Sequence, residues 1–87
     1  MDSFEGKIAV VTGGGTGMGR ELCLQLVKEG CNIATCDVLM ENLEETKTLC
    51  QEINSDILVT LHQCDVSSEE AMNHFRDEVV AAHGDKI

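Results

Sequence analysis

The chain has 87 residues, which is enough for one small domain. It carries 16 acidic and 6 basic side chains, a formal net charge of −10, and this balance argues against binding to nucleic acid or to an anionic membrane, which both need clustered Lys and Arg. The composition, 43% hydrophobic and 25% charged, is that of a globular protein rather than a disordered one.

Short apolar runs alternate with amphipathic segments along the chain. The runs at residues 7–12, 32–36 and 56–61 predict strands, and the segments at residues 18–29, 40–53 and 68–84 predict helices. The first run ends at a glycine cluster and fits a strand that is buried on both faces of a sheet. The order β-α-β-α-β-α predicts an α/β fold with a parallel sheet. Residues 85–87 look like the approach to a fourth strand, so we expect the chain to stop before that strand.

Each predicted helix has one apolar face. The residues expected on these faces are Met18, Leu22, Cys23, Leu26 and Val27 in the first helix, Leu43, Thr46, Cys50 and Ile53 in the second, and Met72, Phe75, Val79 and Ala82 in the third. Gly30 is the expected C-terminal cap of the first helix. Ser67 is expected to cap the third helix, with Glu70 completing a capping box three residues later.

The five cysteines are Cys23, Cys31, Cys36, Cys50 and Cys64. Their odd number, without a secretory signal, does not fit a disulfide framework, and we expect small buried hydrophobic residues in a reducing cytoplasm. The sequence has no Cys-x-x-Cys pair, so no metal site is predicted, and His62-Gln63-Cys64 is the least poor candidate. No apolar run approaches the roughly 20 residues that cross a bilayer. We therefore expect a cytoplasmic location without membrane binding.

A glycine-rich turn at residues 12–19 joins the first predicted strand to the first predicted helix. Such a turn binds phosphate, because glycines let the backbone approach the anion and the first N–H groups of the helix point at it. The P-loop pattern fails, because Arg20 and Glu21 stand where Lys and Ser/Thr are required. The pattern G-x-G-x-x-G fails at Met18. The pattern T-G-x-x-x-G-x-G fits, with Thr12, Gly13, Gly17 and Gly19.

The sequence resembles the N-terminal part of a classical short-chain dehydrogenase/reductase. The resemblance rests on the apolar residues 7–11, on the glycine turn at residues 12–19, and on Cys64-Asp65-Val66-Ser67 after the third predicted strand. It covers essentially the whole chain but only about the first third of a typical family member. It implies that residues 1–87 are the N-terminal part of a single NAD(P)-binding domain with a Rossmann-type, doubly wound parallel sheet, of which only the β-α-β-α-β-α half is present.

The resemblance also implies roles for residues of the turn. Backbone groups around Gly13, Thr16, Gly17 and Met18 are expected to line the adenosine-phosphate half of the dinucleotide. Gly19 is expected to allow close packing of the helix on the strand, and the hydroxyl of Thr12 is expected to brace the turn. The remaining interpretation, a glycine-rich turn that binds no ligand, stays open.

Asp37 ends the second predicted strand, 18 residues after Gly19. A dinucleotide-binding fold places there the acid that bonds the ribose hydroxyls of adenosine, although a carboxylate that only caps the next turn remains an alternative. A carboxylate about 4 Å from the extra phosphate of NADP costs on the order of 4 kcal/mol at an effective dielectric constant near 20. Neither Val38 nor Thr16 could neutralise that phosphate, and Arg20 belongs to the polar side of its helix. We therefore predict a preference for NAD over NADP.

Asp65 and Val66 follow the third predicted strand. By resemblance, the carboxylate reaches the exocyclic amine of adenine and the Val66 backbone lies beside the ring. The alternative is that Asp65 only begins the turn before Ser67. His62, His74 and His83 have no paired acid at a recognisable spacing, and His74 and His83 are expected on a helix surface.

These features favour the cofactor-binding half of an NAD-dependent oxidoreductase that moves a hydride between nicotinamide and a carbonyl or alcohol substrate. The family's catalytic Ser and its Tyr-x-x-x-Lys pair are absent, and the chain has no Tyr, so no catalytic residue is assigned. The small-molecule substrate is expected to bind to the missing C-terminal part. The resemblance further implies a homo-oligomer, a dimer or a tetramer. A non-catalytic dinucleotide-binding module or redox sensor and a structural fragment without a ligand are the alternatives.

Overall fold

A computed structural model of the protein describes residues 6–84. Three strands alternate with three helices along the chain, as the sequence predicts. The elements are β1 (Ile8–Thr12), α1 (Gly17–Lys28), β2 (Asn32–Asp37), α2 (Met40–Ile53), β3 (Val59–Gln63) and α3 (Glu69–His83). The predicted bounds of α2 are confirmed, and those of α1 and β2 are confirmed to within one residue.

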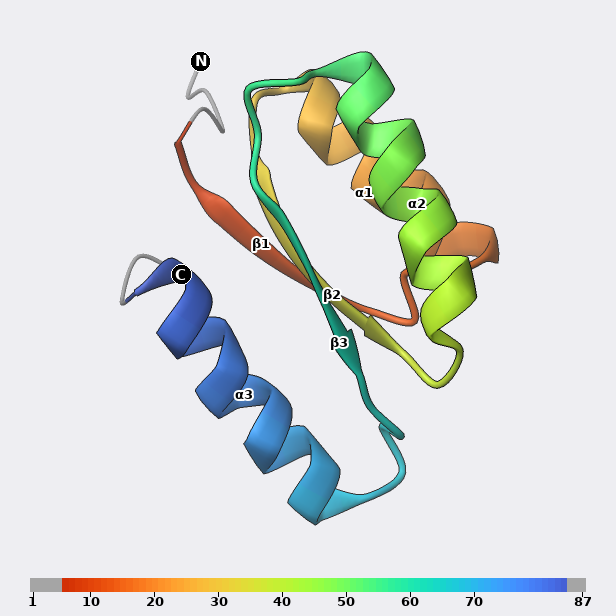
Figure 1. The fold of residues 1–87 in the computed structure, drawn as a ribbon, viewed down its shortest axis with the longest axis vertical. Coiled ribbons are helices and arrows are strands. Elements are labelled where there is room, and N and C mark those ends of the chain that lie inside the picture. The colour runs from red at the N-terminus through yellow and green to blue at the C-terminus, as the bar shows by residue number, and fades with distance from the viewer. Residues whose placement is uncertain (1–5, 85–87) are drawn as a thin grey trace.

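The strands form one parallel sheet in the order β1-β2-β3, with β2 in the centre. On β2, Ile33 lies opposite Ala9 of β1 and Val59 of β3. Helices α1 and α2 cover one face of the sheet, and α3 covers the other (Figure 1). The predicted parallel α/β sandwich of the Rossmann type is therefore confirmed for these elements.

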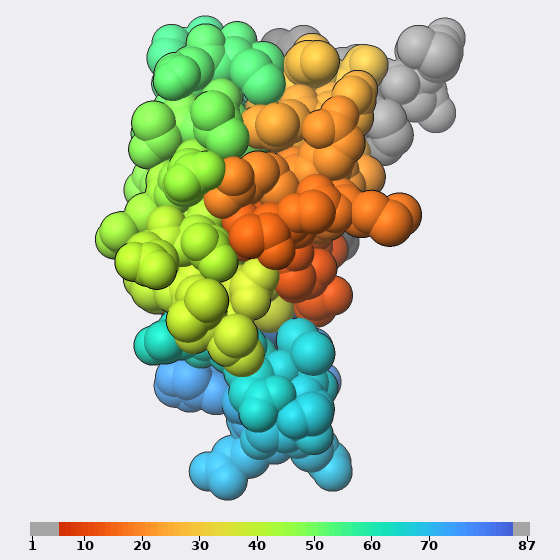
Figure 2. All heavy atoms as spheres, turned by 90° about the vertical axis from the view of Figure 1, so that its right-hand side faces the viewer, coloured from red at the N-terminus to blue at the C-terminus, as the bar shows by residue number. Residues whose placement is uncertain are grey.

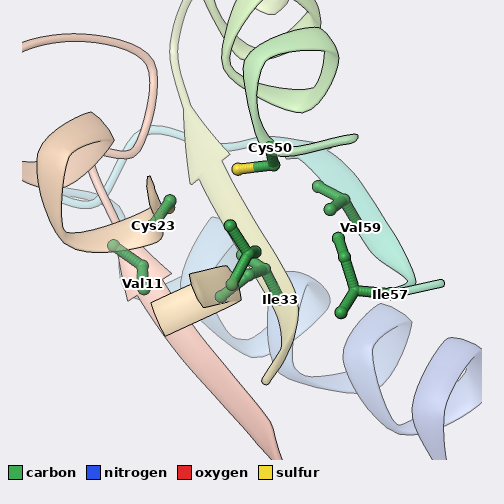
Figure 3. Packing of buried hydrophobic residues seen from close by; sticks show 7 residues of the cluster. Val11, Cys23, Ile33, Cys50, Ile57 and Val59 are labelled. Carbon is green, nitrogen blue, oxygen red and sulfur yellow. The ribbon is translucent and has the colours of Figure 1, made fainter. Parts of the chain in front are cut away.

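The main hydrophobic core lies between the sheet and the pair α1 and α2 (Figure 3). It contains the buried side chains of Val11, Cys23, Val27, Ile33, Cys50, Ile57 and Val59. Each of the two helices contributes one cysteine, and these small –CH2–SH side chains let both helices approach the sheet closely. All five cysteines are buried with unpaired thiols, as the sequence analysis predicts for small hydrophobic residues.

A second core lies between the sheet and α3. It contains Ala34 and Cys36 of β2, Cys64 after β3, and Phe75 and Val79 of α3. Successive β2 residues alternate between the two cores, so β2 is the strand that is buried on both faces. The expectation that the first strand is buried on both faces is wrong for these residues, because β1 lies at the sheet edge and Val10 is 41% exposed.

The apolar face of α1 is rotated from the predicted one. Cys23 and Val27 are fully buried, whereas Met18 is 90% and Leu22 is 50% exposed. Met18 lies in the first turn of α1, next to the glycine turn that follows β1 rather than above the sheet. Two predicted core residues in the last turns of α2 and α3, Ile53 and Ala82, are exposed as well.

Strand β3 begins later than predicted. The backbone N–H of Leu58 donates to Oδ1 of Asn32 at 2.8 Å, so this N–H is bonded to a side chain of the neighbouring strand β2 rather than to its backbone. Regular pairing starts at Val59 and continues through His62 and Gln63. The first residues of the predicted strand therefore form its approach.

Helix α3 also begins one residue later than predicted, and the capping box is absent. Ser68 is the N-cap, and its hydroxyl accepts a hydrogen bond from the N–H of Ala71 at 3.2 Å. Ser67 is directed to Asp65 instead, since its hydroxyl and its N–H both donate to Oδ1 of Asp65, at 2.6 and 2.9 Å. A local turn at the carboxylate thus competes with the helix for this serine.

Candidate functional site

The segments that follow β1, β2 and β3 lie at one edge of the sheet, because all three strands are parallel. Figure 2 shows this edge from the side of α1 and α2, with the orange turn after β1 beside the yellow-green start of α2 and the cyan segment after β3 below them. The predicted site residues of all three segments are therefore brought to one edge. Open α/β sheets bind ligands at such an edge.

The glycine turn uses backbone conformations that glycine adopts readily. Gly13 has φ 71° and Gly17 has φ 60°, both in the left-handed region. Gly19 has another role, since a Cβ built on it would lie 2.1 Å from the carbonyl oxygen of Gly13. The start of α1 thus packs directly on the backbone at the end of β1, which confirms the close approach predicted for Gly19.

The turn is tied to β2 by backbone and side-chain hydrogen bonds. The N–H groups of Gly13 and Gly14 donate to the carbonyl oxygen of Cys36 at 2.8 and 3.1 Å. The hydroxyl of Thr35, which is fully buried, donates to the carbonyl oxygen of Val11 at 2.7 Å. A Cβ on Gly14 would lie 1.8 Å from Oγ1 of Thr35, so a side chain at Gly14 cannot be accommodated without movement.

Asp37 stands at the end of β2 and faces the turn. Its Oδ2 accepts a hydrogen bond from the N–H of Gly15 at 3.0 Å, and its Oδ1 accepts one from the N–H of Val38 at 2.7 Å. Two backbone donors therefore fix the carboxylate plane. Each oxygen keeps a further lone pair for another donor, because a carboxylate accepts about four hydrogen bonds.

Helix α2 supports the turn from behind. The Thr46 hydroxyl is fully buried and donates to the carbonyl oxygen of Gly14 at 2.8 Å. Arg20 donates from Nε to Thr46 Oγ1 at 2.9 Å, from Nη2 to the Gly15 oxygen, and from Nη1 to Glu45. The side of α1 that carries Arg20 is therefore covered by α2 and not by solvent, since the Arg20 side chain is directed at α2 and is only 20% exposed.

The hydroxyl that braces the turn is not that of Thr12. Among residues 6–84, Thr12 makes no side-chain hydrogen bond, whereas Thr35 and Thr46 bond the turn or the strand end before it. Both come from elements other than β1 and lie 24 and 32 positions from their partners. No local spacing could have indicated them. Their polar character at predicted buried positions is the one available signal.

The first turn of α1 is open to a ligand. Thr16 is the N-cap residue, but its side chain makes no capping hydrogen bond, and no acidic residue stands in the first turn. The first N–H groups of a helix carry a partial positive charge and have no partner within the helix. Thr16, Gly17 and Met18 are exposed there. This end of α1 is suited to an anion.

Asp65 and Val66 form an exposed turn after β3. Oδ1 of Asp65 accepts both hydrogen bonds from Ser67, and these bonds lower the pKa of the carboxyl group below its ordinary value of 3.8. Val66 is 54% exposed. The turn-forming role of Asp65 that was kept as an alternative is thus present, and it leaves Oδ2 of this carboxylate outside the Ser67 contacts.

A histidine network between β3 and α3 was missed by the sequence analysis. Nδ1 of His62 lies 2.8 Å from Oε1 of Glu78, and Nε2 of His62 lies 2.9 Å from Oγ1 of Thr60. Thr60 in turn contacts Nε2 of His83 at 2.7 Å, and Nε2 of His74 lies 3.0 Å from the other oxygen of Glu78. His62 therefore has a paired acid, 16 residues away, that its local spacing did not indicate. Among the described residues, no group of three His, Cys, Asp or Glu side chains is arranged to hold a metal ion.

Comparison with known proteins identifies the family. Residues 7–86 match the short chain dehydrogenase family. The chain belongs to this family. A short-chain aldehyde dehydrogenase of Euphorbia lathyris is 39% identical over 81 residues, which cover 93% of this chain and 27% of that protein. The chain thus spans less than a third of the length of this curated relative.

Solved structures agree with this short-chain dehydrogenase fold. Levodione reductase matches with a TM-score of 0.91 and 31% identity over 93% of this chain and 31% of its own. Xylitol dehydrogenase with bound NAD⁺ matches with a TM-score of 0.88 and 36% identity over 95% of this chain and 31% of its own. A metagenomic short-chain oxidoreductase in complex with NADP has a TM-score of 0.84 and 29% identity over 95% and 37% of the two chains. Related short-chain dehydrogenases thus bind either nicotinamide cofactor.

None of the helices in residues 6–84 is both long and apolar enough to cross a membrane.

Proposed function

We propose that this chain is the cofactor-binding part of an NAD-dependent oxidoreductase, and that residues 1–87 belong to a single dinucleotide-binding domain. The whole enzyme would transfer a hydride between the nicotinamide and a carbonyl or alcohol carbon of a small-molecule substrate. The nicotinamide supplies the hydride chemistry, and these residues supply the binding of the adenosine half. The relatives bear the names of dehydrogenases and reductases, which favours an enzyme over a non-catalytic binding module or redox sensor.

In this proposal the pyrophosphate lies against the glycine turn and the uncapped start of α1. The backbone around Gly13, Thr16, Gly17 and Met18 would line it, with Thr12 at the entry to the turn. The exposure of these residues supports the assignment. The close contact between Gly19 and Gly13 would keep the helix N-terminus near the anion.

The adenosine would lie across the ends of β2 and β3. The lone pairs that Gly15 and Val38 leave available on Asp37 would accept the ribose hydroxyls. Asp65 and the exposed Val66 would border the adenine. Helix α2 begins at Met40, so the ribose would bind between this helix and the glycine turn.

The preference for NAD over NADP rests on the Asp37 carboxylate, and this is the observation that carries the proposal. Its charge would repel the phosphate that NADP carries on the adenosine ribose. Arg20 is the one basic side chain within residues 12–20 and 37–42, and its guanidinium already pairs with Glu45. No cation in these two segments is therefore available to neutralise an added phosphate.

The test is a fluorescence titration of the full-length protein with NADH and with NADPH. We expect saturable binding of NADH and binding of NADPH that is weaker by about 100-fold or more, since each 1.4 kcal/mol is tenfold. Equal affinity for the two would contradict the role of Asp37. Absence of binding by either would contradict the proposed function as a whole.

The proposal extends to a cytoplasmic location and to a homodimer or homotetramer as the working form. The first rests on the five unpaired thiols, which fit a reducing compartment. The second follows from the family resemblance.

A further inference from the structure

We propose that Thr46 and Arg20 are positioning residues for the dinucleotide site, holding the glycine turn so that Gly15 presents its N–H to Asp37. Neither residue reaches the exposed face of the turn, and both act on it from the side of α2. This inference rests on the proposed function, because it concerns how Asp37 is kept ready for the adenosine ribose.

The peptide unit between Gly14 and Gly15 is held by hydrogen bonds to both its C=O and its N–H. Its carbonyl oxygen, on Gly14, accepts from the buried Thr46 hydroxyl at 2.8 Å, and its N–H, on Gly15, donates to Oδ2 of Asp37 at 3.0 Å. A peptide unit is planar, so its N–H and C=O turn together. Fixing the carbonyl with Thr46 therefore fixes the direction in which the N–H points, and with it the Asp37 carboxylate.

The next peptide unit is held by a hydrogen bond from Arg20. Nη2 donates to the carbonyl oxygen of Gly15 and, at 3.1 Å, to that of Asn42. The same guanidinium donates from Nε to the Thr46 hydroxyl at 2.9 Å. A hydroxyl that accepts from a charged donor is polarised and becomes a better donor itself, here toward Gly14. Arg20 and Thr46 thus form one connected network rather than two separate contacts.

The network restrains only the side of the turn that faces α2. Gly14 and Gly15 are buried, whereas Thr16 and Gly17 on the opposite side are exposed. A Cβ on Gly15 would lie 2.7 Å from Asp37 Oδ2 and 2.9 Å from the Cβ of Asn42, so the backbone of Gly15 lies close against the carboxylate with no space for a side chain. The N–H of Gly15 is therefore committed to the carboxylate and not to a phosphate.

The competing explanation is that the Arg20 network merely staples α1 to α2. Arg20 does pair with Glu45 across these helices. A contact that only joins the two helices would affect the stability of the protein, and removing it would have the same effect whichever residue stands at position 37. A positioning network would affect cofactor affinity through Asp37, and its effect would disappear when that carboxylate is removed.

The experiment compares Thr46→Val with Thr46→Ser in the full-length protein. Valine keeps the shape and lacks the hydroxyl, and serine keeps the hydroxyl. Thr48→Val is the matched control, because Thr48 is exposed and its hydroxyl bonds only to Glu44 within α2, at 3.0 Å. We expect NADH affinity, measured by fluorescence titration, to fall about 10-fold in Thr46→Val and to change less than about 2-fold in Thr46→Ser and Thr48→Val.

The Asp37→Ala background decides whether the network positions Asp37 or only joins α1 to α2. In that background we expect Thr46→Val to change NADH affinity by less than about 2-fold, because the network has no carboxylate left to position. Arg20→Met should weaken NADH binding, and Arg20→Lys should restore part of it through the acceptors that an ammonium group can still reach. Without cofactor, hydrogen exchange of the peptide covering residues 12–20 should be faster in Thr46→Val than in Thr46→Ser.

Two results would overturn the inference while leaving the proposed function intact. One is unchanged NADH affinity in Thr46→Val together with unchanged hydrogen exchange of residues 12–20. The other is an equal loss of affinity with and without Asp37. If the unsubstituted protein binds neither NADH nor NADPH, the proposed function fails and the inference fails with it.

Discussion

Exchange of the charge at the end of β2 should exchange the cofactor preference. The variant replaces Asp37 by Ala and Val38 by Arg in the full-length protein. Asp37 is half-buried and Val38 is 52% exposed, so the arginine has space to extend toward a ribose phosphate while the carboxylate is removed. We expect the ratio of NADPH to NADH affinity to rise until the two are comparable or inverted.

The magnitude follows from one charge pair. Two unit charges about 4 Å apart interact by about 4 kcal/mol at an effective dielectric constant near 20. Solvent at the half-exposed site screens part of this, so a preference of about 100-fold, or about 2.7 kcal/mol, is the expected lower bound in the unsubstituted protein. The exchange replaces a repulsion by an attraction, so the ratio of the two affinities should change by at least as much as the original preference.

The assay is a titration of NADH and NADPH fluorescence at low and at high ionic strength. Because the Debye length falls from about 10 Å at 0.1 M salt to about 3 Å at 1 M, the preference should narrow at high salt. Asp56→Arg is the matched control, since Asp56 is an exposed carboxylate before the other end of β3 and this substitution also raises the net charge by two. A local role for Asp37 would be refuted if Asp37→Ala with Val38→Arg left the ratio of the two affinities unchanged, or if Asp56→Arg changed that ratio equally.

Three further predictions concern the turn and the histidines. Gly14→Ala should lower the free energy of unfolding, measured by denaturant, by about 1–3 kcal/mol, because its Cβ would lie 1.8 Å from Oγ1 of Thr35. If Thr35→Ala does not reduce this loss of stability, the steric explanation is wrong. Gly17→Val should abolish NADH binding, since a valine at φ 60° is strained by about 1–2 kcal/mol and stands beside the proposed pyrophosphate. A folded variant with normal NADH affinity would contradict the proposed position of the pyrophosphate. Burial, and to a smaller degree His62, lower the pKa of His83 from its ordinary value of 6.5. The unfolded chain then binds the proton more tightly, so the stability contributed by neutral His83 is complete above pH 6.5 and is lost as the pH falls below it. The Tm of His83→Gln should therefore fall less than that of the unsubstituted protein between about pH 7 and about pH 5. An equal fall in Tm would show that His83 does not cause this pH dependence.

The features that could be predicted from the sequence are those set by neighbouring residues. The bounds of α2 follow from its 3.6-residue period, and the glycine turn follows from the spacing of Gly13, Gly17 and Gly19. The place of Asp37 at the edge of the sheet follows from the parallel topology that alternating strands and helices impose. Each of these depends on local pattern or on connectivity alone.

The features that could not be predicted depend on which elements face each other. Arg20 bonds Thr46 across 26 positions, and His62 pairs with Glu78 across 16 positions. A period can place Arg20 on the polar side of α1, but it cannot show that this side is covered by α2. The cap of α3 was predicted at the wrong serine for a local reason, since the hydroxyl of Ser67 donates to Asp65 and Ser68 caps the helix.

A strongly acidic chain and a dianionic cofactor require an explanation of where the attraction arises. The one basic side chain within residues 12–20 and 37–42 is Arg20, and Glu45 neutralises it. If the dinucleotide binds as proposed, its pyrophosphate must be held by neutral dipoles, namely the N–H groups at the start of α1, where no acid stands, because the N–H groups of Gly13, Gly14 and Gly15 already donate to Cys36 and Asp37. The Arg20 and Thr46 network suits this arrangement, because it satisfies the carbonyl groups of Gly14 and Gly15 on the α2 side of the turn. Those oxygens are then directed away from the anion, and the exposed side of the turn presents donors to it.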